Sequence, residues 1–224
     1  DPDESSLFDL CLTIPNIVCS PSTSLDVKKA FYLQAIIWFF VNFASYGITT
    51  WIPVIFDDLK LANVYGSTFL FAVGALPGNI FAILYIERFG RKKLLFWGSI
   101  LACASTIVFG LNTGNETVVI IFSGLFNTMI AFAWSALECI STESFDTKIR
   151  SSILGLMTAV GKLGSIVAQF VNGSLENDVK MLLFVTSLSM LLSGLLSLMM
   201  RETVGTNLET VTRNLSVQEP RKSN

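Results

Sequence analysis

The chain has 224 residues, of which 52% are hydrophobic and only 14% are charged, and its formal net charge is −2. Soluble domains carry about 25% charged residues, so this composition argues against an ordinary soluble domain. Histidine is absent and no strongly basic patch spans the chain, which argues against a nucleic-acid-binding protein and predicts no nucleic-acid partner.

In chain order, a segment rich in Ser, Pro, Asp and Thr (1–25) predicts a loop, and six long apolar runs follow it. A bilayer crossing needs about 20 apolar residues, and a helix satisfies its own backbone hydrogen bonds in lipid. We therefore predict an all-α membrane protein with a loop at 1–29, a six-helix transmembrane bundle at 30–202 and a polar tail at 203–224. The runs are 30–56, 61–86, 94–115, 117–137, 151–175 and 181–200.

Positive charge predicts the orientation of this multi-pass protein. Lys and Arg residues are enriched on the cytoplasmic side of membrane proteins, and here they gather in alternate connections, leaving only Lys60 and Lys180 on the opposite side. We therefore expect both termini to be cytoplasmic. The Asn-x-Ser/Thr sequons at Asn115 and Asn172 then fall on the outer side, as glycosylation candidates. The charges on the first side include Lys28, Lys29, Arg88, Arg91, Lys92, Lys93, Lys148, Arg150 and Arg201.

A single charge interrupts the fifth run. Lys162 lies about 17 Å along a helix from Ser151, near the middle of a bilayer of about 30 Å. An ammonium there costs about 2.5–3.5 kcal/mol on insertion scales, so it needs a polar environment. The polar and small residues of this run recur every three or four positions and form one stripe, which predicts a helix face along an aqueous cavity. The stripe is Gly155, Thr158, Lys162, Ser165, Gln169 and Asn172.

Three other runs carry polar or aromatic residues that we predict to line the same cavity, whereas the third and sixth runs carry no interior Asn, Gln or charge and are predicted to be peripheral. The second run contains Pro77 and Gly78, where a helix can bend and expose carbonyl groups. The alternative is that the amides hold helices together while Gly and Ser allow close packing. The predicted lining residues outside the fifth run are Trp38, Asn42, Tyr46, Asn79, Asn127 and Trp134.

Three hinge segments and one motif inside the first run carry a resemblance. Residues 87–92 (Glu-Arg-Phe-Gly-Arg-Lys), 142–150 (Thr-Glu-Ser-Phe-Asp-Thr-Lys-Ile-Arg) and 202–209 (beginning Glu-Thr-Val-Gly), together with Trp38 and Tyr46-Gly47 in the first run, resemble motifs of the major facilitator superfamily in the same order. The chain resembles the C-terminal half of such a transporter, particularly the organic anion and cation transporters and the synaptic-vesicle-glycoprotein-like branch. Asp146 and Arg201 depart from this pattern, because the family usually has proline there.

The resemblance implies a twelve-helix fold whose N-terminal six-helix half lies outside this chain. It also implies alternating access to a small organic solute bound between the halves, with Lys162 as counter-charge for an anionic or zwitterionic ligand. The alternative is a structural ion pair of Lys162 with Glu138 or with an acid of the other half. A cytoplasmic charge network would close the inner gate, or else its members would only anchor helix ends. This network comprises Glu87, Arg91, Glu143, Arg150 and Glu202.

The sequence contains no recognisable nucleophile–base set or phosphate-binding loop, and the four cysteines form no Cys-x-x-Cys pair. We therefore predict a non-enzyme with no cofactor and no metal site, in contact with the lipid bilayer. Two alternatives to an organic-ion transporter stay open: a sugar-porter-like carrier, and a non-transporting membrane glycoprotein with a transporter fold. We also expect the chain to be a fragment or processed piece of a longer protein.

Overall fold

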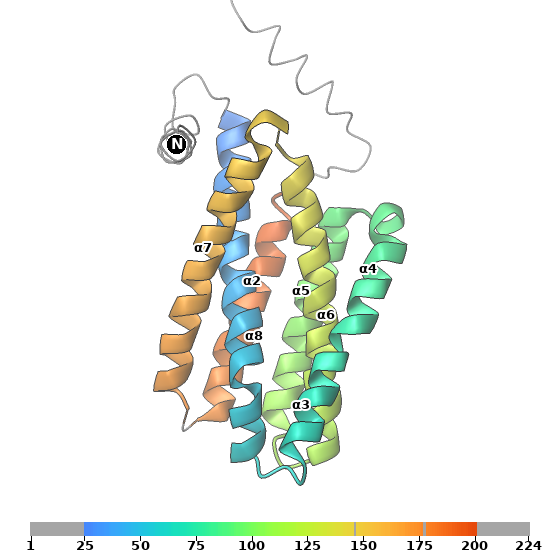
Figure 1. Cartoon of the computed structure of the whole chain (residues 1–224), viewed down its shortest axis with the longest axis vertical. Coiled ribbons are helices and arrows are strands. Elements are labelled where there is room, and N and C mark those ends of the chain that lie inside the picture. The colour runs from blue at the N-terminus through green and yellow to red at the C-terminus, as the bar shows by residue number, and fades with distance from the viewer. Residues whose placement is uncertain (1–24, 146, 177, 201–224) are drawn as a thin grey trace, which may run out of the picture.

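The computed structural model describes residues 25–145, 147–176 and 178–200, and within these ranges the backbone is built from α-helices without a strand (Figure 1). The helices are α2 (Leu25–Asp58), α3 (Val64–Val73), α4 (Ala75–Phe89), α5 (Arg91–Leu111), α6 (Glu116–Glu143), α7 (Thr147–Ser174) and α8 (Val179–Ser197).

Six segments of the described chain are long and apolar enough to cross a bilayer, with α3 and α4 together forming the second. This confirms the predicted all-α, six-span fold and an integral, multi-pass membrane protein. The first helix begins at Leu25, five residues before the predicted start of the bundle at residue 30.

The second span is broken into α3 and α4 at Gly74, three residues before the proline of Pro77-Gly78. Proline has no N–H to donate to the carbonyl four residues earlier, so the helix is weakened at Val73. Side chains of α6 bond the carbonyl oxygens exposed there: the Asn127 amide donates to Phe71 O at 2.7 Å, and the Thr128 hydroxyl donates to Gly74 O at 2.5 Å. The bend expected near Pro77 therefore lies one turn earlier, where α6 supports it.

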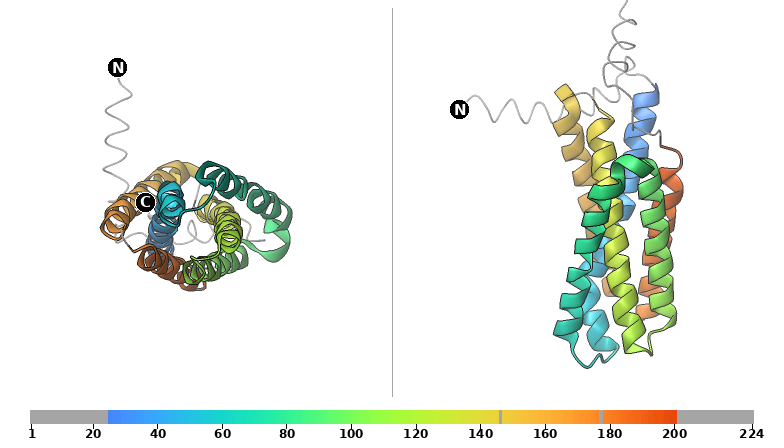
Figure 2. Two further views of the ribbon diagram at one scale, coloured as in Figure 1. Left: turned by 90° about the horizontal axis from the view of Figure 1, so that it is seen from below. Right: turned by 90° about the vertical axis from the view of Figure 1, so that its right-hand side faces the viewer.

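The helices pack as two groups joined at the back of the bundle. Helix α2 packs on α7 and α8, while α6 packs on α4 and α5, and extensive α5–α8 contacts join the groups. In Figure 1, α7, α2, α6 and α4 lie toward the viewer and α5 and α8 lie behind them; the end-on view of Figure 2 (left) shows α2 and α6 side by side near the middle.

Burial follows this arrangement. In the most apolar 18-residue stretch of each span, the buried share is about half in α2 (56%) and α5 (50%), but only 28% in α7 and 17% in α3–α4. The two outer segments of the front therefore keep most of their apolar surface uncovered by the rest of the chain. These two segments flank the front of the bundle, and the site described next lies between them (Figure 1).

Close approach of helices depends on glycine at particular positions. At Gly164 of α7 an added Cβ would lie 2.4 Å from the Phe39 carbonyl oxygen of α2, and at Gly78 of α4 it would lie 2.1 Å from the Thr128 carbonyl oxygen of α6. Non-bonded atoms cannot approach so closely, so the α2–α7 and α4–α6 spacings require a residue without a side chain.

Candidate substrate site and charge pair

The lysine of the fifth span lies at the junction of α7 and α2. The Lys162 Nζ donates a hydrogen bond of 3.0 Å to the Tyr46 hydroxyl and lies 4.1 Å from the centroid of the Tyr46 ring. Both side chains are exposed, and Thr158, one turn earlier on α7, is exposed as well. Among the described residues no carboxylate, including that of Glu138, is within ion-pair distance of the Lys162 amine. The ammonium is thus held by neutral oxygen and an aromatic face and keeps donors available to a ligand.

Two amides continue the α7 stripe. The Gln169 Oε1 accepts a 2.8 Å hydrogen bond from the Trp51 indole, and its Nε2 donates to the Tyr46 carbonyl and the Thr50 hydroxyl at 3.3 and 3.4 Å. Asn172 is buried and donates to Gly47 O at 3.1 Å, while its Oδ1 has no hydrogen-bond partner in the structure. These bonds tie α7 to α2 and hold the Gln169 amide beside Tyr46.

The tryptophans bridge α2 and α6. The Trp38 indole donates to the Ser141 hydroxyl at 2.9 Å, and the Trp134 indole donates to the Ser45 hydroxyl at 3.1 Å. The two rings meet edge to face, with centroids 5.2 Å apart. Asn42 is buried, donates to the Trp38 carbonyl at 2.8 Å within α2, and packs its amide against Gly161 of α7. The aromatic pair therefore forms a wall of the α2–α6 junction, and neither indole N–H is left unbonded.

The two serines were not singled out as partners of these tryptophans. A signal for the pairing exists, because tryptophan precedes serine by seven residues on both spans, at 38 and 45 on one and at 134 and 141 on the other. Seven residues are two helical turns, so on antiparallel helices each indole meets the opposite serine.

The remaining predicted lining residues lie apart from this cluster. Asn127 bonds the α3–α4 break as described above, and Asn79 is exposed on α4. The structure brings together Lys162, Tyr46, Gln169 and Asn42 at the α2–α7 junction, and Trp38 and Trp134 at the α2–α6 junction. The Asn127 amide is engaged by backbone, and Asn79 is separate from both sets.

At the end of the bundle where α5 begins and α6 ends, Arg91 and Glu143 form an ion pair. The Arg91 Nη2 lies 2.6 Å from the Glu143 Oε1, and the Arg91 Nε donates to the Cys139 sulfur at 3.1 Å. Both charged side chains are largely covered, with 16% and 30% of their surface exposed. The second Glu143 oxygen is buried without a hydrogen-bond partner in the structure. The attraction between partly buried charges of this kind is screened less by salt than that between exposed ones.

The structure describes two of the other three predicted members of the charge network, Arg150 and Glu87. The Arg150 Nε donates to the Phe145 carbonyl at 3.4 Å, Glu87 is exposed on α4, and Glu202 lies outside the described residues. Cys139, which the sequence analysis did not assign to the network, contacts both charged groups because it precedes Glu143 by one helical turn.

The two glycosylation candidates differ in accessibility. Asn115 is exposed at the start of α6, where its side chain accepts a hydrogen bond from Val118 N. Asn172 is buried inside α7 with its amide bonded to Gly47, so this amide is not free to carry a glycan in the folded protein. We retain only Asn115 as a glycosylation candidate.

Comparison with known proteins places this arrangement in a family. Residues 19–215 match the family described as "Sugar (and other) transporter". The chain belongs to this transporter family. This confirms the predicted major facilitator fold, of which the six described spans form one half, and it agrees with the prediction that the chain is not an enzyme.

Similar proteins of known name come from bacteria and mammals. The chain is 30% identical over 138 residues to the "Niacin transporter NiaP" of Acinetobacter baylyi, a match that covers 61% of this chain and 31% of that protein. It is 30% identical over 150 residues to the human "Synaptic vesicle glycoprotein 2B" and 27% identical over 148 residues to the human "Synaptic vesicle glycoprotein 2C". These matches cover 65% and 66% of this chain but only 22% and 20% of the two glycoproteins. The chain thus spans about a third of the bacterial relative and a fifth of the mammalian ones.

Proposed function

We propose that the chain supplies one half of a carrier that moves small organic solutes, preferentially anionic ones, across a membrane by alternating access. The observation that carries the proposal is the Lys162 ammonium: it lies at mid-span, exposed, and bonded to a neutral tyrosine hydroxyl with no carboxylate of the described residues beside it. A charge in that position is costly unless it faces water or a ligand.

The geometry around Lys162 suits a carboxylate. The lysine donates to the Tyr46 oxygen, which leaves the Tyr46 hydroxyl proton available as a second donor beside the remaining ammonium protons. A carboxylate presents two acceptor oxygens and would engage both groups. The partly exposed Trp134 ring offers an apolar contact to an organic body, and the buried Trp38 ring supports it from the α2 side.

A second six-helix bundle would complete the site. The segments α3–α4 and α7 flank the front of the bundle, and the rest of this chain leaves most of their apolar stretches unburied. A partner half seated there would enclose the α2–α7 and α2–α6 junctions at mid-membrane, where ligands of such folds bind between repeats. The relatives are longer than the matched segment, which leaves room for such a half.

The Arg91–Glu143 pair fits a gate at the cytoplasmic end, with both termini on that side because positive residues concentrate there. Arg91 and Glu143 both lie in this half, at the start of α5 and the end of α6, so the pair breaks in one of the two access states only if these two helix ends shift relative to each other.

The test is uptake of labelled nicotinate and benzoate by the full-length protein in cells. Losing a charge-assisted hydrogen bond costs about 1.5–3 kcal/mol, so Lys162→Gln should lower the apparent affinity about 10- to 100-fold. Lys162→Arg should retain uptake, and Lys180→Gln, an exposed lysine at the start of α8, is the matched control.

The outcomes separate the alternatives. Unchanged uptake in Lys162→Gln would contradict the counter-charge role. Uptake of neutral hexoses that depends on Gln169 but not on Lys162 would favour a sugar carrier. Absence of uptake for organic ions and sugars, with the protein glycosylated at Asn115 and on the membrane surface, would favour a non-transporting glycoprotein.

A further inference from the structure

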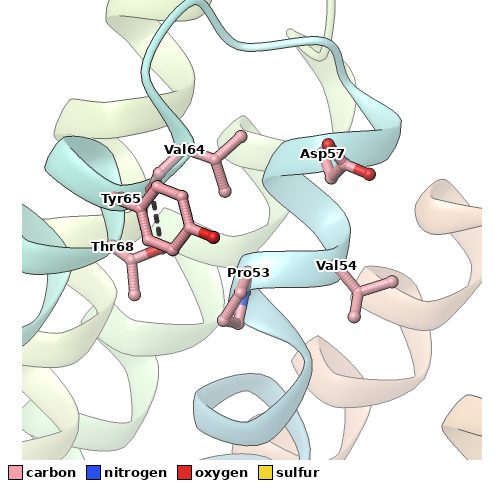
Figure 3. Close-up of a pocket in the computed structure, with 6 residues that line it drawn as sticks. All are labelled: Pro53, Val54, Asp57, Val64, Tyr65 and Thr68. Atoms are coloured by element: carbon pink, nitrogen blue, oxygen red, sulfur yellow. Dashed lines mark hydrogen bonds between the residues drawn. The ribbon is translucent and has the colours of Figure 1, made fainter.

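The end of the bundle opposite the Arg91–Glu143 pair contains a hollow between α2 and α3 that the proposed function does not use. Its volume is about 550 Å³, within the range of small-molecule sites. Figure 3 shows Val64 and Tyr65 of α3 on one side and Val54 and Asp57 of α2 on the other. The lining residues are Pro53, Val54, Asp57, Val64, Tyr65 and Thr68.

The lining combines one negative charge, one aromatic ring and apolar walls. Asp57 is exposed, and among the described residues no cation is within ion-pair distance of its carboxylate. Tyr65 is 90% exposed, so the rest of the chain covers little of this residue. The Thr68 hydroxyl donates its proton to Val64 O at 2.8 Å and so presents only acceptor lone pairs to the hollow. None of these groups offers a positive charge to an anion.

Charge at this end of the bundle favours a cationic occupant. The loops and helix ends there carry five acids against two lysines in the described residues, the opposite of the basic end that holds Arg91. An aromatic face and a carboxylate around one cavity are the two groups that recognise organic ammonium ions. The charged residues are Asp57, Asp58, Glu116, Glu176 and Asp178, with Lys60 and Lys180.

The hollow also shares a helix face with the candidate substrate site. Tyr46, Thr50, Val54 and Asp57 are exposed and recur every three or four residues along α2. Asp57 lies about 17 Å along this stripe from Tyr46, so the hollow and the Lys162–Tyr46 pair are two separate positions on one path.

We propose that this hollow is a binding site for an organic ammonium ion with an apolar or aromatic body. The Asp57 carboxylate is the counter-charge, the Tyr65 ring contacts the cationic head, and Val54, Val64 and Pro53 contact the body. The proposal is independent of anion binding at Lys162, since the two sites use different residues.

The experiment measures binding of benzyltrimethylammonium to the full-length protein in lauryl maltoside, a detergent without an ammonium headgroup, by NMR saturation-transfer titration. Asp57→Asn should weaken binding about fivefold, as expected for the loss of one partly exposed charge contact. Tyr65→Leu should weaken it two- to fivefold, whereas Tyr65→Phe, which keeps the ring, should change it by less than about twofold.

Asp58→Asn is the matched control, because Asp58 is the adjacent exposed carboxylate and does not line the hollow. The affinity of this variant should stay within about twofold of the unmodified chain. Equal losses in Asp57→Asn and Asp58→Asn would overturn the site in favour of diffuse surface attraction. Equal binding by Tyr65→Leu and the unmodified chain would assign Tyr65 to membrane anchoring and overturn the proposal as well. Helical circular dichroism of each variant checks folding.

Benzoate, titrated in parallel, distinguishes this inference from the proposed function. Its binding should respond to Lys162→Gln and not to Asp57→Asn, and benzyltrimethylammonium should show the reverse. If only benzoate responds as expected, the ammonium site is wrongly assigned. If only benzyltrimethylammonium responds as expected, the anion site at Lys162 is wrongly assigned.

Discussion

Helices α7 and α8 both carry polar residues through the membrane, but they satisfy them in different ways. In α8, Thr186 and Ser189 donate to Leu182 and Val185 one turn earlier in the same helix. In α7, Lys162, Gln169 and Asn172 reach across to Tyr46, Thr50 and Gly47 of α2. Short hydroxyl side chains return to their own backbone, whereas long amide and ammonium groups need a partner helix or water. Polar residues of the first kind support packing, and those of the second kind mark the candidate site.

The largest expected effect comes from forcing α7 and α2 apart. Gly164→Ala would place a methyl group against the Phe39 carbonyl, and such overpacking costs about 1–3 kcal/mol. The free energy of unfolding, measured by SDS titration in mixed micelles, should fall accordingly. Gly155→Ala on the same helix meets no atom within 4 Å, so it should be neutral or stabilising by up to about 1 kcal/mol. Equal effects of the two substitutions would contradict the described α2–α7 contact.

An effect of similar size is expected from the α2–α6 bridge. Ser141→Ala removes the acceptor of the buried Trp38 indole, and an unsatisfied buried donor costs about 1–3 kcal/mol. Ser189→Ala of α8 removes a hydroxyl that bonds only its own helix, and it should cost less than about 0.5 kcal/mol. The same SDS titration compares the two, and an equal loss would show that partner-helix bonds are no more important than bonds within a helix.

The smallest effect on stability is expected at the candidate site itself. Lys162→Met removes an exposed amine–tyrosine contact worth about 0.5–1 kcal/mol and spares the packing around Gly161 and Gly164. Its unfolding midpoint should stay close to that of the unmodified chain, although solute binding is lost. A destabilisation above about 2 kcal/mol would indicate that Lys162 is a structural residue of the α2–α7 packing.

Much of the fold could be predicted from sequence because hydrophobic length determines which segments cross a membrane. The six spans were identified in this way. The position of the break within the second span was not, because Pro77 weakens the helix upstream and the choice of Gly74 depends on Asn127 and Thr128 of another helix.

The candidate site was less predictable. A polar residue in a span needs a hydrogen-bonding partner, but the sequence does not identify which residue that partner is. The stripe containing Lys162 and Gln169 was predicted from periodicity, but their contacts with Tyr46 and Trp51 depend on how α7 is rotated against α2. Asn127 and Asn42 donate to backbone carbonyls, whereas the Gln169 amide bonds the Trp51 and Thr50 side chains as well as the Tyr46 carbonyl. Their role in a cavity therefore stays a prediction, as does the gating role of Arg91 and Glu143.

The most direct test is whether position 162 is in contact with water. Lys162→Cys, in the full-length protein lacking its other reactive cysteines, should react with a charged methanethiosulfonate reagent, because a thiolate forms readily only where water reaches it. Leu163→Cys lies at the same depth, about 100° around the helix, and should react far more slowly. Rapid labelling at 162, slowed by benzoate, is the predicted result; no labelling at 162, or equal labelling at 162 and 163, would contradict a lysine that faces an aqueous solute path.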